Sequence, residues 1–140
     1  MQNIDLLIII GLPGSGKSRL AKNFEKDFLI FDDFIGTYQI DYLVNMLLNG
    51  NKICITDPRL CLPDIFDRYV NKFLQYIKKS RIYLILYKND PEQCIKNIKL
   101  NKFKKTGIRK TIIQYSEYYD LNNYLDFKHY TIDVYHSRKN

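Results

Sequence analysis

Residues 6–24, LLIIIGLPGSGKSRLAKNF, decide the fold of this 140-residue chain. The apolar run Leu6–Ile10 is typical of a buried strand, and a helical pattern of apolar side chains begins near Arg19. The residues between them match the pattern G-x-x-x-x-G-K-S/T at every fixed position. Because this pattern requires a strand before it and a helix after it, the segment predicts a phosphate-binding loop, or P-loop.

Each residue type in this loop has a chemical reason. Glycines let backbone N–H groups turn toward an anion, and the following helix directs its positive end to the same place. Lys17 reaches the β- and γ-phosphates of a nucleotide, and the Ser18 hydroxyl suits Mg²⁺. The chain has no N-K-x-D segment, which disfavours a GTPase. We therefore expect ATP and Mg²⁺ as cofactors, with the nucleotide held by Gly11, Leu12, Pro13, Gly14, Ser15, Gly16, Lys17 and Ser18.

The rest of the chain alternates strands with helices. Parallel strands need crossovers of this length, so the pattern predicts a doubly wound α/β domain with a five-stranded parallel sheet. Ligands of such sheets bind at the carboxyl ends of the strands. The expected strands are 4–10, 28–31, 52–56, 81–87 and 130–135, and the expected helices are 19–26, 38–48, 64–79, one from 90 onward, and 111–119.

The length indicates one domain over residues 1–140, because a chain of this size holds a single core. Leu6–Ile10 is too short to span a bilayer and lacks the features of a secretion signal. We expect a cytoplasmic protein that binds no membrane. If its bias toward Lys, Ile, Asn and Tyr reflects an AT-rich viral genome, that cytoplasm is the host's. The sequence leaves the oligomeric state open.

The net charge of +7 is concentrated in one segment. Residues 93–116 contain seven basic residues and no acidic one, and elsewhere the basic and acidic residues are equal in number. Two interpretations stay open, a solvated helix face and a segment that meets phosphate groups.

Acidic residues follow two of the expected strands. Asp32 and Asp33 come after strand 28–31, and Asp57 comes after strand 52–56. Because parallel strands end at one edge of a sheet, these carboxylates are expected beside the P-loop. One would orient Mg²⁺ and another would accept the proton of an attacking hydroxyl. Acids also cap turns after strands, and we favour that interpretation for Asp33 taken alone.

The chain resembles the small P-loop kinases, and within them the phage-type 5′-hydroxyl polynucleotide kinase domain. The loop GLPGSGKS, the segment FDDF at 31–34 and the segment ITD at 55–57 carry the resemblance. It implies a sheet of nucleoside/nucleotide-kinase type within a three-layer α/β/α P-loop NTPase fold. It also implies Asp32 as general base, Asp57 as a metal-supporting residue, and a lid over residues 96–110.

Several positions depart from this family. Phe31 and Ile35 stand where the family has arginines around the paired acids. Lys102 stands where it has a catalytic lid arginine, although a small shift would place Arg109 there. Lysine does not grip phosphate in the two-pronged way of arginine. Asp33 and Arg59 are candidate acceptor ligands, and Arg59 is equally compatible with a solvated loop position.

The leading hypothesis is a kinase that transfers the γ-phosphate of ATP to a hydroxyl, with Lys17, Asp32, Lys102 and Arg109 as catalytic residues and Ser18 and Asp57 as metal ligands. The acceptor is a nucleic acid 5′ end or a small nucleoside or nucleotide. An ATP-binding or ATPase module without an acceptor is the alternative. Nucleic-acid binding through the basic segment alone is a third hypothesis, which the intact P-loop disfavours.

Overall fold

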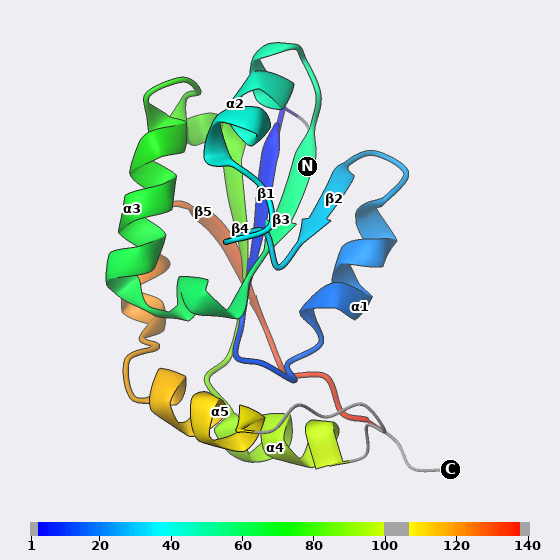
Figure 1. Cartoon of the computed structure of the whole chain (residues 1–140), viewed down its shortest axis with the longest axis vertical. Coiled ribbons are helices and arrows are strands. Elements are labelled where there is room, and N and C mark those ends of the chain that lie inside the picture. Colours follow the sequence, from blue (N-terminus) through cyan, green and yellow to red (C-terminus); the bar gives the residue numbers. More distant parts are fainter. Residues whose placement is uncertain (1–2, 100–106, 138–140) are drawn as a thin grey trace.

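Strand β1 (Leu6–Ile10) lies at the centre of a five-stranded parallel sheet in a computed structural model that describes residues 3–99 and 107–137 (Figure 1). The strand order is β2-β3-β1-β4-β5, and every neighbouring pair is parallel. All five side chains of β1 are buried, which explains its continuous apolar run. The other strands are β2 (Leu29–Asp32), β3 (Ile53–Thr56), β4 (Ile82–Tyr87) and β5 (Lys128–Ile132).

Helices cover both faces of this sheet, so the predicted three-layer α/β/α fold is confirmed (Figure 1). Helix α1 (Lys17–Ala21) lies on one side, and α3 (Pro63–Leu74) lies on the other with α2 (Ile40–Leu48). Helices α4 (Pro91–Lys99) and α5 (Ile108–Ser116) lie together beyond the carboxyl ends of the strands. These two helices therefore border the edge where ligands of such sheets bind.

Helices α1 and α3 each end five residues before the sequence predicts. Helix α1 ends at Ala21, and the chain continues as a 3-10 turn, Lys22–Phe24. Helix α3 ends at Leu74, because the N–H groups of Tyr76 and Ile77 both donate to the carbonyl of Phe73. That shared acceptor tightens the last turn, although the apolar period continues. Helix bounds depend on such terminal contacts, which apolar spacing does not report.

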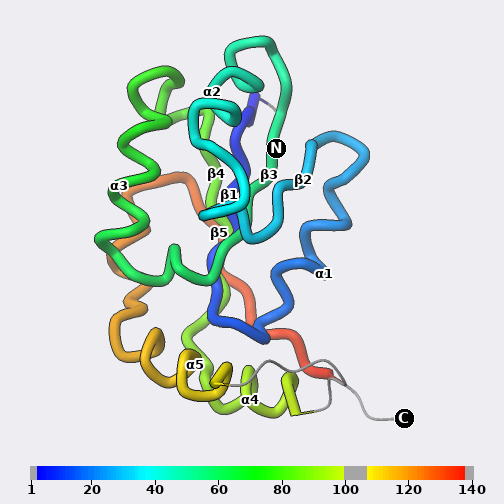
Figure 2. Tube along the Cα trace, viewed as in Figure 1, coloured from blue at the N-terminus to red at the C-terminus, as the bar shows by residue number. Residues whose placement is uncertain are grey.

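The chain after β5 returns to the P-loop. In Figure 2 this segment, drawn in red, passes beside the blue loop that follows β1. The backbone N–H of Tyr135 donates to the carbonyl of Ser15 at 3.0 Å. The expected strand 130–135 is observed at Lys128–Ile132, and its last residues instead cross the P-loop. None of the helices in the described ranges combines the length and apolar character needed to cross a membrane.

Candidate functional site

The P-loop connects β1 to α1 and folds back on itself. The N–H of Ser15 donates to the carbonyl of Leu12 at 3.1 Å, closing a tight turn. The ammonium of Lys17 donates to the same carbonyl at 3.0 Å across the loop. Gly14 and Gly16 have φ angles of 84° and 108°, which residues with a Cβ rarely adopt. The sequence motif therefore corresponds to a closed loop with Lys17 folded over it.

Neighbouring elements press closely on these two glycines. A Cβ on Gly14 would lie 2.7 Å from the backbone carbonyl of Cys94 in α4. A Cβ on Gly16 would lie 2.7 Å from the Cβ of Tyr135 in the segment after β5. The loop is therefore packed between α4 and the C-terminal segment, and only glycine fits at either position.

Lys17 is a buried cation. Its side chain is almost excluded from solvent. Burial lowers the pKa of Lys17 below its ordinary value, and nearby groups, including the carboxylates of Asp33 and Asp32, act in the opposite direction. An anion bound in the loop would offset the cost of burying this charge, because opposite charges favour the ionised form.

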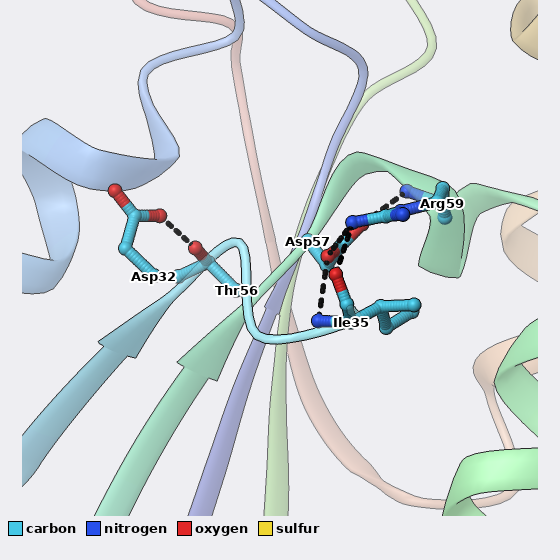
Figure 3. A network of polar contacts seen from close by, with 5 residues as sticks. All are labelled: Asp32, Ile35, Thr56, Asp57 and Arg59. Carbon is cyan, nitrogen blue, oxygen red and sulfur yellow. Dashed lines mark hydrogen bonds and ion pairs between the residues drawn. The ribbon is translucent and has the colours of Figure 1, made fainter. Parts of the chain in front are cut away.

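A chain of hydrogen bonds joins the P-loop to the ends of β2 and β3. The hydroxyl of Ser18 donates to one carboxylate oxygen of Asp32. The hydroxyl of Thr56 donates to the other oxygen (Figure 3). Asp32 therefore has both oxygens engaged, one of them by the residue that the motif assigns to the metal.

Asp57 belongs to a second network (Figure 3). Its carboxylate is fully buried and accepts two hydrogen bonds from the guanidinium of Arg59, both at 2.8 Å. It also accepts from the backbone N–H groups of Ile35, at 3.0 Å, and of Arg59, at 2.9 Å. This hydrogen-bonded pairing raises the pKa of Arg59 above its ordinary value. Asp57 thus fixes the Arg59 side chain and leaves no exposed oxygen for a metal ion.

Replacing Asp57 by asparagine is expected to destabilise the protein by about 1–3 kcal/mol, because a buried carboxylate that accepts four hydrogen bonds, two of them from the partly exposed Arg59 guanidinium, loses its charge. The free energy of unfolding in urea measures this change. The control is Asp126→Asn, because Asp126 pairs with Lys79 at 2.7 Å but is almost fully exposed. We expect no measurable change for the control. Equal stabilities for the two variants would contradict the structural role of Asp57.

The P-loop and Arg59 border one open cleft of about 1070 Å³ at the carboxyl edge of the sheet. Seven residues that the sequence singles out line it, and these are Pro13, Gly14, Gly16, Lys17, Ser18, Asp33 and Arg59. Asp33 has a φ of 49°, an uncommon conformation for a residue with a side chain. The following residue, Phe34, is fully buried and anchors the turn that directs Asp33 to the cleft.

The expected lid residues are only partly described. Lys102 lies outside the described residues. Arg109 lies near the start of α5 and is exposed, whereas Ile108, Thr111 and Tyr115 are the α5 residues that line the cleft. The structure therefore brings α5 to the cleft but does not place Arg109 on its wall.

Sequence reasoning missed Asn97 and Tyr135, which contact each other at this site. The amide of Asn97 in α4 donates to the carbonyls of Gly14, at 2.8 Å, and Tyr135, at 2.6 Å. The guanidinium of Arg19 lies over the ring of Tyr135, 4.4 Å from its centre. Asn97 is one of several polar residues in α4, and Tyr135 is one of twelve tyrosines, so neither has a distinctive signal in the sequence.

Comparisons with known proteins agree with this architecture, although no protein-family model matches the chain. A gluconokinase from Sinorhizobium meliloti 1021 has a TM-score of 0.66 at 10% identity, covering 96% of this chain and 85% of its own. A deoxyadenosine kinase from M. mycoides, determined with bound dATP, has a TM-score of 0.51 at 16% identity, covering 91% and 90%. These likenesses show that the fold is that of P-loop nucleoside and gluconate kinases.

A sequence relative establishes the family. "Uncharacterized protein R277" of Acanthamoeba polyphaga mimivirus is 43% identical over 122 residues, which cover 85% of this chain and 88% of that protein. Identity at this level over nearly the whole of both chains means common descent. The chain belongs to the same protein family as this mimivirus protein.

Proposed function

We propose that this protein is an ATP-dependent phosphotransferase that moves the γ-phosphate of ATP to a hydroxyl acceptor. One observation carries the proposal, namely that a closed P-loop shares a single cleft with Asp33 and the anchored Arg59. The volume of about 1070 Å³ is at the upper end of the usual range for small-molecule sites. A nucleotide and a second reactant therefore have room to meet.

The donor phosphates are assigned to Gly11–Ser18. Lys17 supplies the positive charge over the β- and γ-phosphates, which neutralises charge that develops during transfer. The buried hydroxyl oxygen of Ser15 has no hydrogen-bond partner among the described residues. A buried polar group normally has a partner, so this hydroxyl fits a loop that is completed by a phosphate.

Ser18 and Asp32 fit Mg²⁺, because a hydroxyl and a carboxylate meet beside the phosphate loop. These two residues would hold the ion there, and it would supply positive charge that neutralises the phosphates. The described residues contain no group of three or more His, Cys, Asp or Glu side chains that could hold a metal. This is compatible with Mg²⁺, because that ion usually takes only one or two protein ligands beside phosphates and waters.

The acceptor is assigned to the Asp33 side of the cleft. In this proposal Asp33 accepts the proton of the attacking hydroxyl, and Arg59 binds the acceptor. Asp32 then has the metal role that the sequence gives to Asp57, and Asp57 positions Arg59. The contacts of Asp32 with Ser18 and Thr56 support this exchange of roles.

We also propose a lid over residues 96–110, with Lys102 and Arg109 as the cations that it brings to the phosphates. Residues 108–110 begin α5, and this helix contributes side chains to the cleft wall. Closure of this segment would bring Arg109 nearer to the transferring phosphoryl group. The whole unit, residues 1–140, would then act as one kinase domain.

A transfer assay tests the function. The protein is incubated with γ-labelled ATP, Mg²⁺ and one acceptor at a time: a 5′-hydroxyl oligonucleotide, nucleosides, nucleoside monophosphates or gluconate. The sequence suggests the oligonucleotide, the nucleosides and the nucleoside monophosphates as acceptors. The structural neighbours suggest nucleosides and gluconate. Label on one acceptor is the expected result. Label released only as phosphate, with every acceptor, would instead indicate the ATPase alternative.

A further inference from the structure

The side chain of Asn97 connects three segments that are distant in sequence. Its amide nitrogen donates to the carbonyls of Gly14 and Tyr135, at 2.8 and 2.6 Å. Its amide oxygen accepts from the N–H of Ser137 at 3.1 Å and from the side chain of Gln93 at 3.0 Å. An amide has two donor hydrogens and two acceptor positions, so Asn97 uses its full capacity here.

Asn97 is one of three groups that hold successive P-loop carbonyls from outside the loop. It binds the carbonyl of Gly14, the N–H of Tyr135 binds that of Ser15, and the hydroxyl of Tyr87 binds that of Gly16, the last two both at 3.0 Å. A trans peptide is planar, so its N–H points away from its carbonyl. Holding the carbonyls of Ser15 and Gly16 outward therefore directs the next N–H groups toward the interior of the loop, where an anion would bind.

Asn97 also supports the group that holds the second carbonyl. Tyr135 gives its N–H to Ser15 while its own carbonyl accepts from Asn97. One side chain thus fixes the Gly14 carbonyl directly and orients the backbone that fixes the Ser15 carbonyl. Loss of Asn97 would therefore leave the Gly14 carbonyl without this partner and weaken the support of the Ser15 carbonyl.

We infer that Asn97 is a positioning residue that holds the P-loop in its anion-binding conformation. The inference rests on the proposed function only as far as the loop binds phosphates. It does not depend on which acceptor receives the phosphoryl group. Asn97 acts through the loop backbone, and no contact with the nucleotide is required.

Asn89 provides a matched control elsewhere in the fold. Its amide nitrogen also donates to two backbone carbonyls, of Ser116 at 2.8 Å and Tyr119 at 2.9 Å, at the end of α5. Neither carbonyl belongs to the P-loop. Asn97→Leu and Asn89→Leu therefore each remove two hydrogen bonds donated to backbone carbonyls without adding charge, and Asn97→Leu also removes the two that Asn97 accepts.

The test measures the affinities of both variants for ATP with Mg²⁺, and for inorganic tripolyphosphate, by calorimetry at a temperature where both are folded. We expect Asn97→Leu to weaken both ligands by at least about tenfold, the effect of one to two lost hydrogen bonds. Asn89→Leu should keep wild-type affinity for both ligands, even if its thermal unfolding midpoint falls by as much as that of Asn97→Leu. If Asn97→Leu does not fold, the smaller and uncharged Asn97→Ser replaces it.

The outcomes separate the inference from the function. If the wild type binds tripolyphosphate and the Asn97 variant binds it equally well, the positioning role is overturned and the phosphate site stands. Equal losses in the Asn97 and Asn89 variants would reduce Asn97 to general stability and also overturn the role. A wild type that binds neither ligand overturns the phosphate site together with this inference.

Discussion

Replacing Lys17 by methionine is expected to abolish measurable ATP binding without weakening the fold. The ammonium of Lys17 crosses the P-loop to the carbonyl of Leu12 and is the buried cation of the phosphate site. Charge-assisted hydrogen bonds to phosphate in a buried site are strong, so we expect a loss of affinity of at least about a hundredfold. Calorimetric titration with ATP and Mg²⁺ measures it.

The control for this prediction is Lys22→Met, because Lys22 is exposed in the turn after α1. This variant should bind ATP as the wild type does. Unaltered affinity in Lys17→Met would contradict the assignment of Gly11–Ser18 as the phosphate site. An equal loss in both variants would point to overall charge as the cause.

The stability of Lys17→Met relative to the wild type should change with pH in a defined direction. Because the pKa of Lys17 is lowered, the folded protein binds fewer protons than the unfolded chain as the pH approaches 10.5. The free energy of unfolding of the wild type therefore rises with pH in that window through this group. Lys17→Met lacks this rise, so it should be at least as stable as the wild type at neutral pH, with an advantage that shrinks as the pH increases.

Replacing Asp33 by asparagine is expected to reduce phosphoryl transfer by about a hundredfold or more while ATP with Mg²⁺ still binds. General base catalysis contributes roughly that much, and Asp33 is the carboxylate on the cleft wall. Single-turnover transfer to the acceptor found in the screen measures the rate, and calorimetry measures the binding.

Asp32→Asn is the companion variant, because the two acids are neighbours and their replacement is chemically identical. It should raise the Mg²⁺ concentration needed for half-maximal transfer, since Asp32 contacts the Ser18 hydroxyl. Retained transfer in Asp33→Asn, with abolished transfer and an ordinary Mg²⁺ requirement in Asp32→Asn, would return the role of base to Asp32.

The sequence predicts the inner strands of the sheet well, because β1, β3 and β4 consist almost entirely of buried, mostly apolar residues. The run Leu6–Ile10 is buried on both sides, and only a central parallel strand requires that. The P-loop is equally easy to predict from the sequence, since its glycines occupy positions where a Cβ would collide with other elements. Local requirements of this kind restrict the residue types that a position accepts, so they can be inferred from the sequence.

The sequence predicts the hydrogen-bond partners of polar side chains less well. Asp32 and Asp57 both follow strands, and nothing in the sequence states that one contacts Ser18 whereas the other is buried against Arg59. Asn97 contacts Gly14 from 83 positions away. Such contacts depend on how helices pack at the end of the sheet, and that packing is not encoded in any local pattern.

The hydrogen bond between Tyr135 and Ser15 has a consequence for biosynthesis. A ribosome makes residues 11–18 before it makes residues 87, 97 and 135, whose groups hold the carbonyls of the loop in place. A nascent chain that has completed β1 and α1 therefore still lacks the segment after β5. Nucleotide would then be unable to stabilise chains that end before residue 135, and competence for binding would arrive only once that residue has been made.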